Sequence, residues 1–149
     1  MKYWLHVQEY LLSLLLDLDG IQQDYRYHPE GDALFHSLQV FQIALQETNN
    51  AILITAALFH DIGKVQGSKD HDKIGAAMLE GIFSSEVIWL IEHHLDLLRH
   101  PTQTQKHLRH NKQKLNNLQK LRKWDLAGRD PYAEVISPQT AISTLFKFL

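Results

Sequence analysis

The sequence contains no cysteine among its 149 residues. This absence excludes disulfide bonds, thiolate metal sites and cysteine nucleophiles, and it gives no sign of an oxidising compartment. Long hydrophobic runs are also missing, because the apolar run at residues 11–18 is interrupted by Ser13 and Asp17 and is too short to cross a bilayer. No basic region with a cleavage site precedes this run. We therefore expect a cytoplasmic protein with no secretory signal and no membrane partner.

Alternating strand patterns are absent as well, and the apolar residues recur with helical periodicity instead. Hydrophobic residues make up 44% of the chain and charged residues 21%, which is typical of a folded globular protein. The length suits one hydrophobic core. We therefore predict an all-α fold, a compact helical bundle formed by a single domain over residues 1–149.

Capping residues and apolar periodicity together place the helices. They predict helices at residues 3–18, 32–47, 51–62, 72–79, 84–98, 111–127 and from 138 to the carboxyl end. Asp32 is the expected N-cap of the second helix, whereas Gly20 and Gly63 are expected to end the first and third. The stretch from Pro101 is predicted to be a loop or a short helical segment.

Acidic residues are absent from residues 99–124, although eight of the chain's 15 lysines and arginines lie there. The remaining seven basic residues stand against all 17 acids. A basic segment in an otherwise acidic chain favours an anionic ligand, such as a phosphate-bearing molecule or RNA. A solvated helix face explains the same charges, so both interpretations stay open.

Five ionisable residues lie on apolar helix faces, since each is four and seven residues away from apolar residues on the same face. They are His36, His60, Asp61, His94 and Asp125. Any one of them alone is better explained as a hydrogen-bonded core histidine or an aspartate paired with an arginine. Five together are costly to bury unless they satisfy one another, which a shared metal ion would do. Imidazole and carboxylate ligands without thiolates suit iron, manganese, cobalt, nickel or zinc.

The segment at residues 57–64, Ala-Leu-Phe-His-Asp-Ile-Gly-Lys, resembles the signature of the HD-domain superfamily of metal-dependent phosphohydrolases. The pattern of that superfamily is one histidine, then a His-Asp pair, then a distant aspartate. Residues 28–36, 70–76 and 124–129 also resemble the HD domain of bacterial CCA-adding tRNA nucleotidyltransferases, so the resemblance covers about residues 28–130. The chain has no room for the nucleotidyltransferase head of those enzymes, and we expect no nucleotide addition.

The resemblance implies a set of metal ligands. A first divalent transition metal ion would be bound by His36, His60, Asp61 and Asp125. In dinuclear members of the superfamily, further histidines complete a second site that the aspartate of the His-Asp pair would bridge. The histidines expected at such positions are His71, His93 and His94. One or two ions are therefore predicted, and one of the adjacent pair His93 and His94 is open to a hydrogen-bonding or substrate-facing role instead.

Two cationic residues are candidates for catalysis beside Asp61. Lys64 and Arg129 could bind phosphate oxygens and balance the charge that develops in the reaction. A lysine near a helix C-terminus and an arginine in a salt bridge are the simpler alternatives. Asp32 lies on the same helix face as His36, so it could contact metal or water as well as serve as an N-cap.

The function that these features predict is metal-dependent hydrolysis, as a phosphatase or phosphodiesterase, of a nucleotide or an RNA end. Two alternatives remain. Some proteins that share the metal ligands are diiron oxygenases, and a non-catalytic nucleotide- or RNA-binding module would also explain the basic segment. The identity of the metal, the substrate and the oligomeric state do not follow from the sequence.

Overall fold

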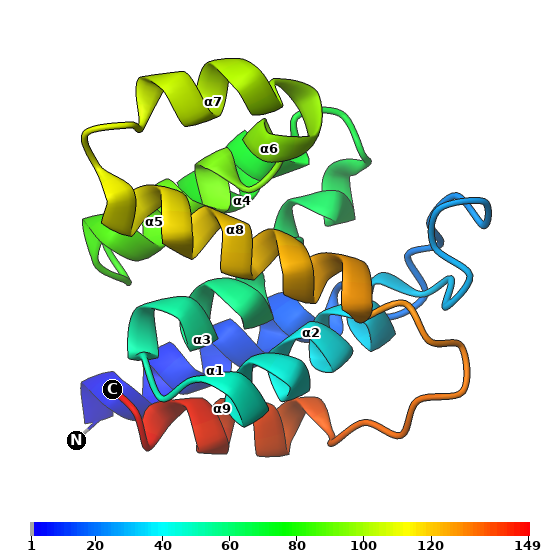
Figure 1. Cartoon of the computed structure of the whole chain (residues 1–149). Coiled ribbons are helices and arrows are strands. Elements are labelled where there is room, and N and C mark those ends of the chain that lie inside the picture. Colours follow the sequence, from blue (N-terminus) through cyan, green and yellow to red (C-terminus); the bar gives the residue numbers. More distant parts are fainter. Residues whose placement is uncertain (1) are drawn as a thin grey trace.

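Helices form nearly all of the regular structure in the computed structural model, which describes residues 2–149 (Figure 1). In chain order these are α1 (Lys2–Leu16), α2 (Ala33–Glu47), α3 (Ala51–Phe59), the 3-10 helix η1 (Ile62–Gln66), α4 (His71–Leu79), α5 (Ser85–His93), α6 (Asp96–Arg99), α7 (Pro101–His107), α8 (Lys112–Ala127) and α9 (Pro138–Phe146). Within residues 2–149 the only β-type pairing is an isolated bridge between Gln22 and Asp32. The predicted all-α fold class is therefore confirmed.

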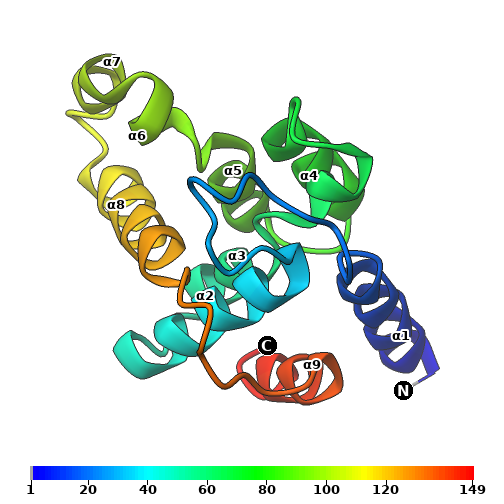
Figure 2. The same ribbon diagram turned by 90° about the vertical axis from the view of Figure 1, so that its right-hand side faces the viewer.

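Helix α3 lies at the centre of the bundle, in contact with α2, α5, α8 and α9 (Figure 2). Its residues from Leu53 to Phe59 are all buried, because this short helix is apolar on every side. Helices α1 and α9 pack against each other, and α4 packs against α5 on the opposite side of the molecule. None of the helices over residues 2–149 is long and apolar enough to cross a membrane.

Asp32 begins α2 as an N-cap, as predicted. Its Oδ2 accepts a hydrogen bond from the backbone N–H of Phe35 at 2.8 Å. Its Oδ1 accepts from the N–H of Gly20 at 2.6 Å, so the same side chain ties the turn after α1 to the start of α2. Both carboxylate oxygens are thus engaged with backbone donors, and Asp32 is not part of the metal-binding groups described below.

The third helix ends earlier than predicted. Helix α3 stops at Phe59, His60 and Asp61 form a turn, and η1 follows. Gly63 therefore lies inside η1 and does not terminate α3. A Cβ on Gly63 would lie 2.1 Å from the carbonyl oxygen of His71, so the glycine is needed for η1 to pack directly on α4. This packing carries the His-Asp pair out of the helix and turns it towards α4.

The helix predicted at residues 84–98 is also divided. Helix α5 ends at His93 and α6 begins at Asp96, with a turn at His94 and Leu95. Both turn residues are buried, and the Nδ1 of His94 donates to the carbonyl of Ile91 at 2.6 Å. The stretch from Pro101 is the short helix α7. The helices predicted at 32–47, 72–79, 111–127 and from 138 match α2, α4, α8 and α9 within two residues at their amino-terminal ends.

Candidate metal centre

Four buried side chains from three parts of the chain converge on one point. His36 comes from α2, His60 and Asp61 from the turn after α3, and Asp125 from α8. The Nε2 of His36 lies 2.9 Å from Oδ1 of Asp125, and the Nε2 of His60 lies 3.3 Å from Oδ2 of Asp61. One ligand atom from each of the four lies within 4.8 Å of all the others. This is the spacing that a common metal ion requires.

A second group shares Asp61 with the first. The Nε2 atoms of His71 and His94 lie 3.2 and 3.4 Å from Oδ1 of Asp61, whereas its Oδ2 faces His60 and His36. His71 begins α4 and His94 follows α5. Each oxygen of one carboxylate therefore faces a different group of histidines, an arrangement suited to bridging two ions.

The four histidines have the same tautomeric arrangement. The Nδ1–H of each ring donates to a backbone carbonyl: His36 to Gly128 at 2.8 Å, His60 to Ala57 at 2.8 Å, His71 to Ser68 at 2.8 Å and His94 to Ile91 at 2.6 Å. These bonds leave Nε2 as the atom that faces the acids.

Three of the four inward-facing nitrogens lack hydrogen-bond partners. The Nε2 atoms of His60, His71 and His94 are buried and unpaired within the described chain. A nitrogen lone pair that faces a carboxylate oxygen at 3.2 to 3.4 Å is repelled unless a cation lies between them. The donor set therefore fits a divalent metal ion, since such an ion satisfies the nitrogens and neutralises the aspartates together.

The electrostatics of the cluster favour positive charge. Burial alone would lower the pKa of His60, but the negative charge of Asp61 and the contact with Asp125 outweigh burial and raise this pKa to about 10. Burial likewise opposes ionisation of Asp61, yet His60 and Lys64 hold the pKa of Asp61 well below its usual value. The metal-free cluster therefore holds a proton. A divalent metal ion would supply a larger positive charge at the same place.

A cavity of about 520 Å³ opens beside the cluster. Asp61 and Asp125 lie in its wall, together with basic side chains from four segments. The basic residues are Lys64, Arg99, Arg122 and Arg129. An anion that enters the cavity meets these cations directly beside the candidate metal ligands.

The two predicted catalytic cations, Lys64 and Arg129, are both held in place at this cavity. The Nζ of Lys64 lies 3.2 Å from Oδ2 of Asp61 and donates to the side-chain oxygen of Gln23. Arg129 donates through Nη1 to the carbonyl of Tyr27 at 2.8 Å, and its Nη2 lies 3.6 Å from Oδ1 of Asp125. The salt bridge expected for Arg129 is thus present, and it leaves the guanidinium at the cavity wall. Their catalytic roles stay predictions.

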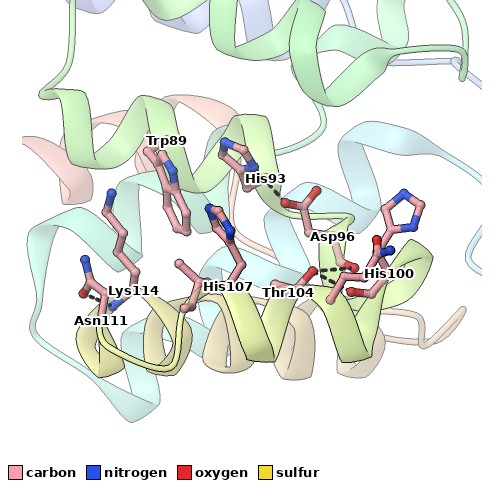
Figure 3. Close-up of a pocket in the computed structure, with 10 residues that line it drawn as sticks. Trp89, His93, Asp96, His100, Thr104, His107, Asn111 and Lys114 are labelled. Carbon is pink, nitrogen blue, oxygen red and sulfur yellow. Dashed lines mark hydrogen bonds and ion pairs between the residues drawn. The ribbon is translucent and has the colours of Figure 1, made fainter.

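His93 does not reach the metal centre, so its assignment as a ligand needs correction. Its Nδ1 lies 2.7 Å from Oδ2 of Asp96, and its ring lies against Trp89 with the ring centroids 4.7 Å apart (Figure 3). Adjacent helical residues point about 100° apart. With His94 directed at Asp61, His93 at the last position of α5 is directed away from it, into a different cavity.

Two residues of the loop before α2, His28 and Glu30, join the cluster although the apolar periodicity does not point to them. The Oε2 of Glu30 lies 3.5 Å from Nδ1 of His36, and its Oε1 lies 3.0 Å from Nδ1 of His28. Burial, with Lys64 and Arg129 nearby, lowers the pKa of His28 to about 4. Helical periodicity does not apply in a loop. The available signal was their position inside the segment that resembles the CCA-adding enzymes.

The HD-domain family model matches residues 34–136, which is most of the chain and includes the four converging residues. The chain belongs to the HD-domain family. It is thus a member of the superfamily of metal-dependent phosphohydrolases that the His-Asp motif predicted. HD domains bind divalent metals, and the buried cluster around Asp61 is a donor set for such an ion.

Curated relatives of this HD-domain protein are similar over short regions. The Multifunctional CCA protein of Nitrosococcus oceani is 45% identical over 49 residues, which cover 33% of this chain and 12% of that protein. The Bifunctional uridylyltransferase/uridylyl-removing enzyme of Haemophilus influenzae is 34% identical over 98 residues, covering 60% of this chain and 10% of the enzyme. The chain therefore spans about a tenth of the length of these relatives.

Proposed function

We propose that this HD-domain protein is a phosphatase or phosphodiesterase that hydrolyses a phosphoester on a nucleotide or an RNA end. The observation that carries the proposal is the bridging position of Asp61 between two groups of histidines, in which the Nε2 atoms of His60, His71 and His94 are buried and unpaired. These groups lie at the wall of a cavity lined by basic side chains. Metal ligands beside an anion-binding cavity are the components that phosphoester hydrolysis needs.

The proposed ligands divide between two ions. His36, His60, Asp61 and Asp125 would hold the first, and Asp61, His71 and His94 the second. A bound divalent ion would lower the pKa of a water molecule towards neutrality and polarise a phosphoryl oxygen. The carbonyl groups that accept from Nδ1 orient the four imidazoles before any ion binds, so little reorganisation is required.

The side chains around the cavity would bind the phosphate. The ammonium of Lys64 and the guanidinium of Arg129 are held by hydrogen bonds to other groups, so both are fixed before a substrate arrives. Arg122 extends this cationic wall on the side of Asp125. The volume of about 520 Å³ lies in the range of cavities that bind small ligands. The relatives are named for CCA and for the removal of uridylyl groups, which supports a substrate built from nucleotides.

The test is a metal-dependent hydrolysis assay. Purified protein is stripped of metal and reloaded with Mn²⁺, Co²⁺, Ni²⁺, Fe²⁺ or Zn²⁺. Each form is then assayed on phosphomonoesters, 2′,3′-cyclic nucleotides, linear diesters and cyclic dinucleotides. We expect turnover with at least one metal, loss of turnover in Asp61→Asn, and no change in Asp19→Asn, whose aspartate is exposed at the end of the turn after α1.

Two results would contradict this function. Oxygen-dependent turnover of an iron-loaded protein, without phosphate release, would identify a diiron oxygenase. Nucleotide binding without turnover under any metal would identify a non-catalytic binding module. Anaerobic activity with manganese or cobalt excludes both alternatives, because neither an oxygenase nor a binding module would release phosphate under those conditions.

A further inference from the structure

A second cavity, separate from the metal centre, lies between α5, α7 and the start of α8 (Figure 3). Its volume is about 630 Å³. The two cavities share no lining residue. The turn between α5 and α6 separates them, since His93 and Asp96 face the second cavity whereas Leu95 and Leu98 line the first.

The cavity contains a lysine without a carboxylate partner. The Nζ of Lys114 lies 4.6 Å from the centre of the Trp89 ring, and within residues 2–149 Lys114 takes part in none of the ion pairs. Some cations near the metal centre and on α8, such as Lys64 and Lys123, pair with acids, whereas Lys114 lies over an aromatic ring. The π-face of Trp89 favours the ammonium at this place but does not neutralise its charge. Lys114 is therefore a positioned cation that an anion could neutralise.

Apart from Asp96, each polar side chain that lines the cavity carries at least one hydrogen-bond donor. Figure 3 shows the side chains of His107 and Lys114 reaching towards Trp89 from α7 and from the first turn of α8. The acid in the cavity wall, Asp96, is already engaged by His93 at 2.7 Å. A cavity that combines a free ammonium with aromatic rings has the chemistry to contact both the phosphate and the base of a nucleotide.

The position of the cavity relative to the metal centre indicates a longer ligand. Lys114 lines the second cavity and Arg122 lines the first, and both lie on α8. Eight residues of helix separate them, which is about 12 Å at a rise of about 1.5 Å per residue. At about 3.4 Å per stacked nucleotide, this distance corresponds to three or four nucleotides. Residues 99–124, which span both ends of this path, contain no acid.

We propose that the cavity formed by Trp89, His107 and Lys114 binds an internal nucleotide of a single-stranded RNA whose end lies in the metal centre. The placement of that end rests on the proposed function, whereas the binding of the nucleotide phosphate at Lys114 does not. A free nucleotide carries the same phosphate chemistry, but it cannot contact both cavities at once.

The test measures binding of fluorescein-labelled hexauridylate by fluorescence anisotropy, in EDTA so that no hydrolysis occurs. Lys114→Gln is compared with Lys112→Gln, which removes an exposed lysine that lies on the same helix but outside the cavity. We expect Lys114→Gln to raise Kd roughly tenfold, since hydrogen bonds to charged groups contribute about that much. We also expect Lys114→Gln to reduce the slope of log Kd against log salt concentration by about 0.7. Lys112→Gln should change Kd less than about twofold.

Further arms identify the source of the phosphate and control for folding. Uridine monophosphate and inorganic phosphate are titrated as competitors, and the strand proposal requires both to compete far more weakly than unlabelled hexauridylate. Equal competition by the mononucleotide would mean that the cavity takes free nucleotides and would overturn the RNA proposal. Lys114→Arg, which keeps the charge, should restore most of the binding if Lys114→Gln acts through the phosphate and not through misfolding.

Failure of the RNA-binding proposal can be distinguished from failure of the proposed hydrolytic function. Equal loss of binding in Lys112→Gln and Lys114→Gln would overturn the cavity assignment, even if the metal-loaded protein hydrolyses phosphoesters. Conversely, a selective effect of Lys114→Gln supports nucleotide binding in this cavity, even if no phosphoester is hydrolysed.

Discussion

At the scale of single residues, the metal centre depends on hydrogen bonds that fix imidazole orientation. Three of the four inward histidines, His60, His71 and His94, donate Nδ1–H to the carbonyl of the residue three positions earlier. Such a short-range bond is available where the chain turns at either terminus of a helix. The bond orients each ring so that its Nε2 points into the cluster. The residue type and the local turn together therefore define the ligand.

Two adjacent histidines should therefore differ in their effect on metal content. We expect His94→Gln to reduce bound metal by at least one equivalent, because it removes a nitrogen that faces Asp61 at 3.4 Å. His93→Gln should retain full metal content, since His93 pairs with Asp96 instead. Metal stoichiometry measured by mass spectrometry after dialysis checks both, and equal loss in the two variants would contradict the ligand assignment.

A second prediction at this scale concerns the cation beside Asp61. Lys64→Gln should lower kcat by roughly 10²- to 10³-fold, in the range found when one charge-stabilising donor is removed from an active site. Metal content should be preserved, because the ammonium is not a ligand. Steady-state kinetics on the substrate found in the hydrolysis assay test this, with the exposed Lys69→Gln as the matched control. An unchanged kcat would show that Lys64 only balances the charge of Asp61.

At the scale of elements, close packing of backbone on backbone determines where the ligands lie. Gly63 in η1 and Gly75 in α4 lie against each other, and a Cβ on Gly63 would meet the backbone nitrogen of Gly75 at 2.7 Å. A contact with both side chain and backbone joins the end of α8 to α2, where a Cβ on Gly128 would lie 2.6 Å from Cγ2 and 3.1 Å from the backbone nitrogen of Val40. The first contact brings His71 to Asp61. The second allows the carbonyl of Gly128 to reach His36.

Substitution of Gly63 should therefore destabilise the protein and disturb the second ligand group. We expect Gly63→Ala to lower the free energy of unfolding by about 1–3 kcal/mol, because α4 must move away to accommodate the added methyl group. Urea unfolding of the metal-free protein measures this change. Gln66→Ala, at an exposed position of the same 3-10 helix, should have little effect. Equal stability of the two variants would contradict the packing argument.

At the scale of the whole molecule, helices distant in sequence build one cluster in which acids and imidazoles are coupled. His36 and Asp125 are 89 residues apart in the chain, yet their side chains are hydrogen-bonded in the interior. The cluster therefore links the protonation state and the metal content to the stability of the entire bundle.

The metal-free protein should lose stability as the pH rises. His60 has a pKa of about 10 in the folded state and 6.5 as its ordinary value. Its raised pKa stabilises the folded state fully below pH 6.5, and this contribution is lost as the pH rises through about 10. Thermal unfolding in EDTA across this range should show a falling Tm. The decrease of Tm with pH should be smaller in His60→Gln. It should persist in His6→Gln, because His6 is exposed.

Metal binding should stabilise the bundle and release a proton. A metal present at 100 times its Kd stabilises the folded state by about 2.7 kcal/mol. Because the ion displaces the proton at His60, its apparent affinity should rise with pH. Calorimetric titrations in two buffers with different ionisation enthalpies measure the protons released. No proton release near pH 7 would contradict the assignment of His60 as a ligand.

Several features of this protein follow from the sequence alone. Apolar periodicity and capping residues predict the helices α2, α4, α8 and α9, because these features act within a few residues of one another. The His-Asp motif identifies the family, and the ionisable residues on apolar faces are indeed buried. Local interactions and burial are properties of a segment, and so they can be predicted from its residues.

Only the tertiary structure determines which of two neighbouring residues faces the metal centre. Where α3 and α5 end depends on packing against α4 and on the burial of Leu95, neither of which appears in the local pattern. Those ends determine that His94 faces Asp61 and that His93 does not. The participation of Glu30, from a loop, likewise depends on the fold. The metal centre is assembled from residues far apart in the chain, and their distances are set by the packing of whole helices.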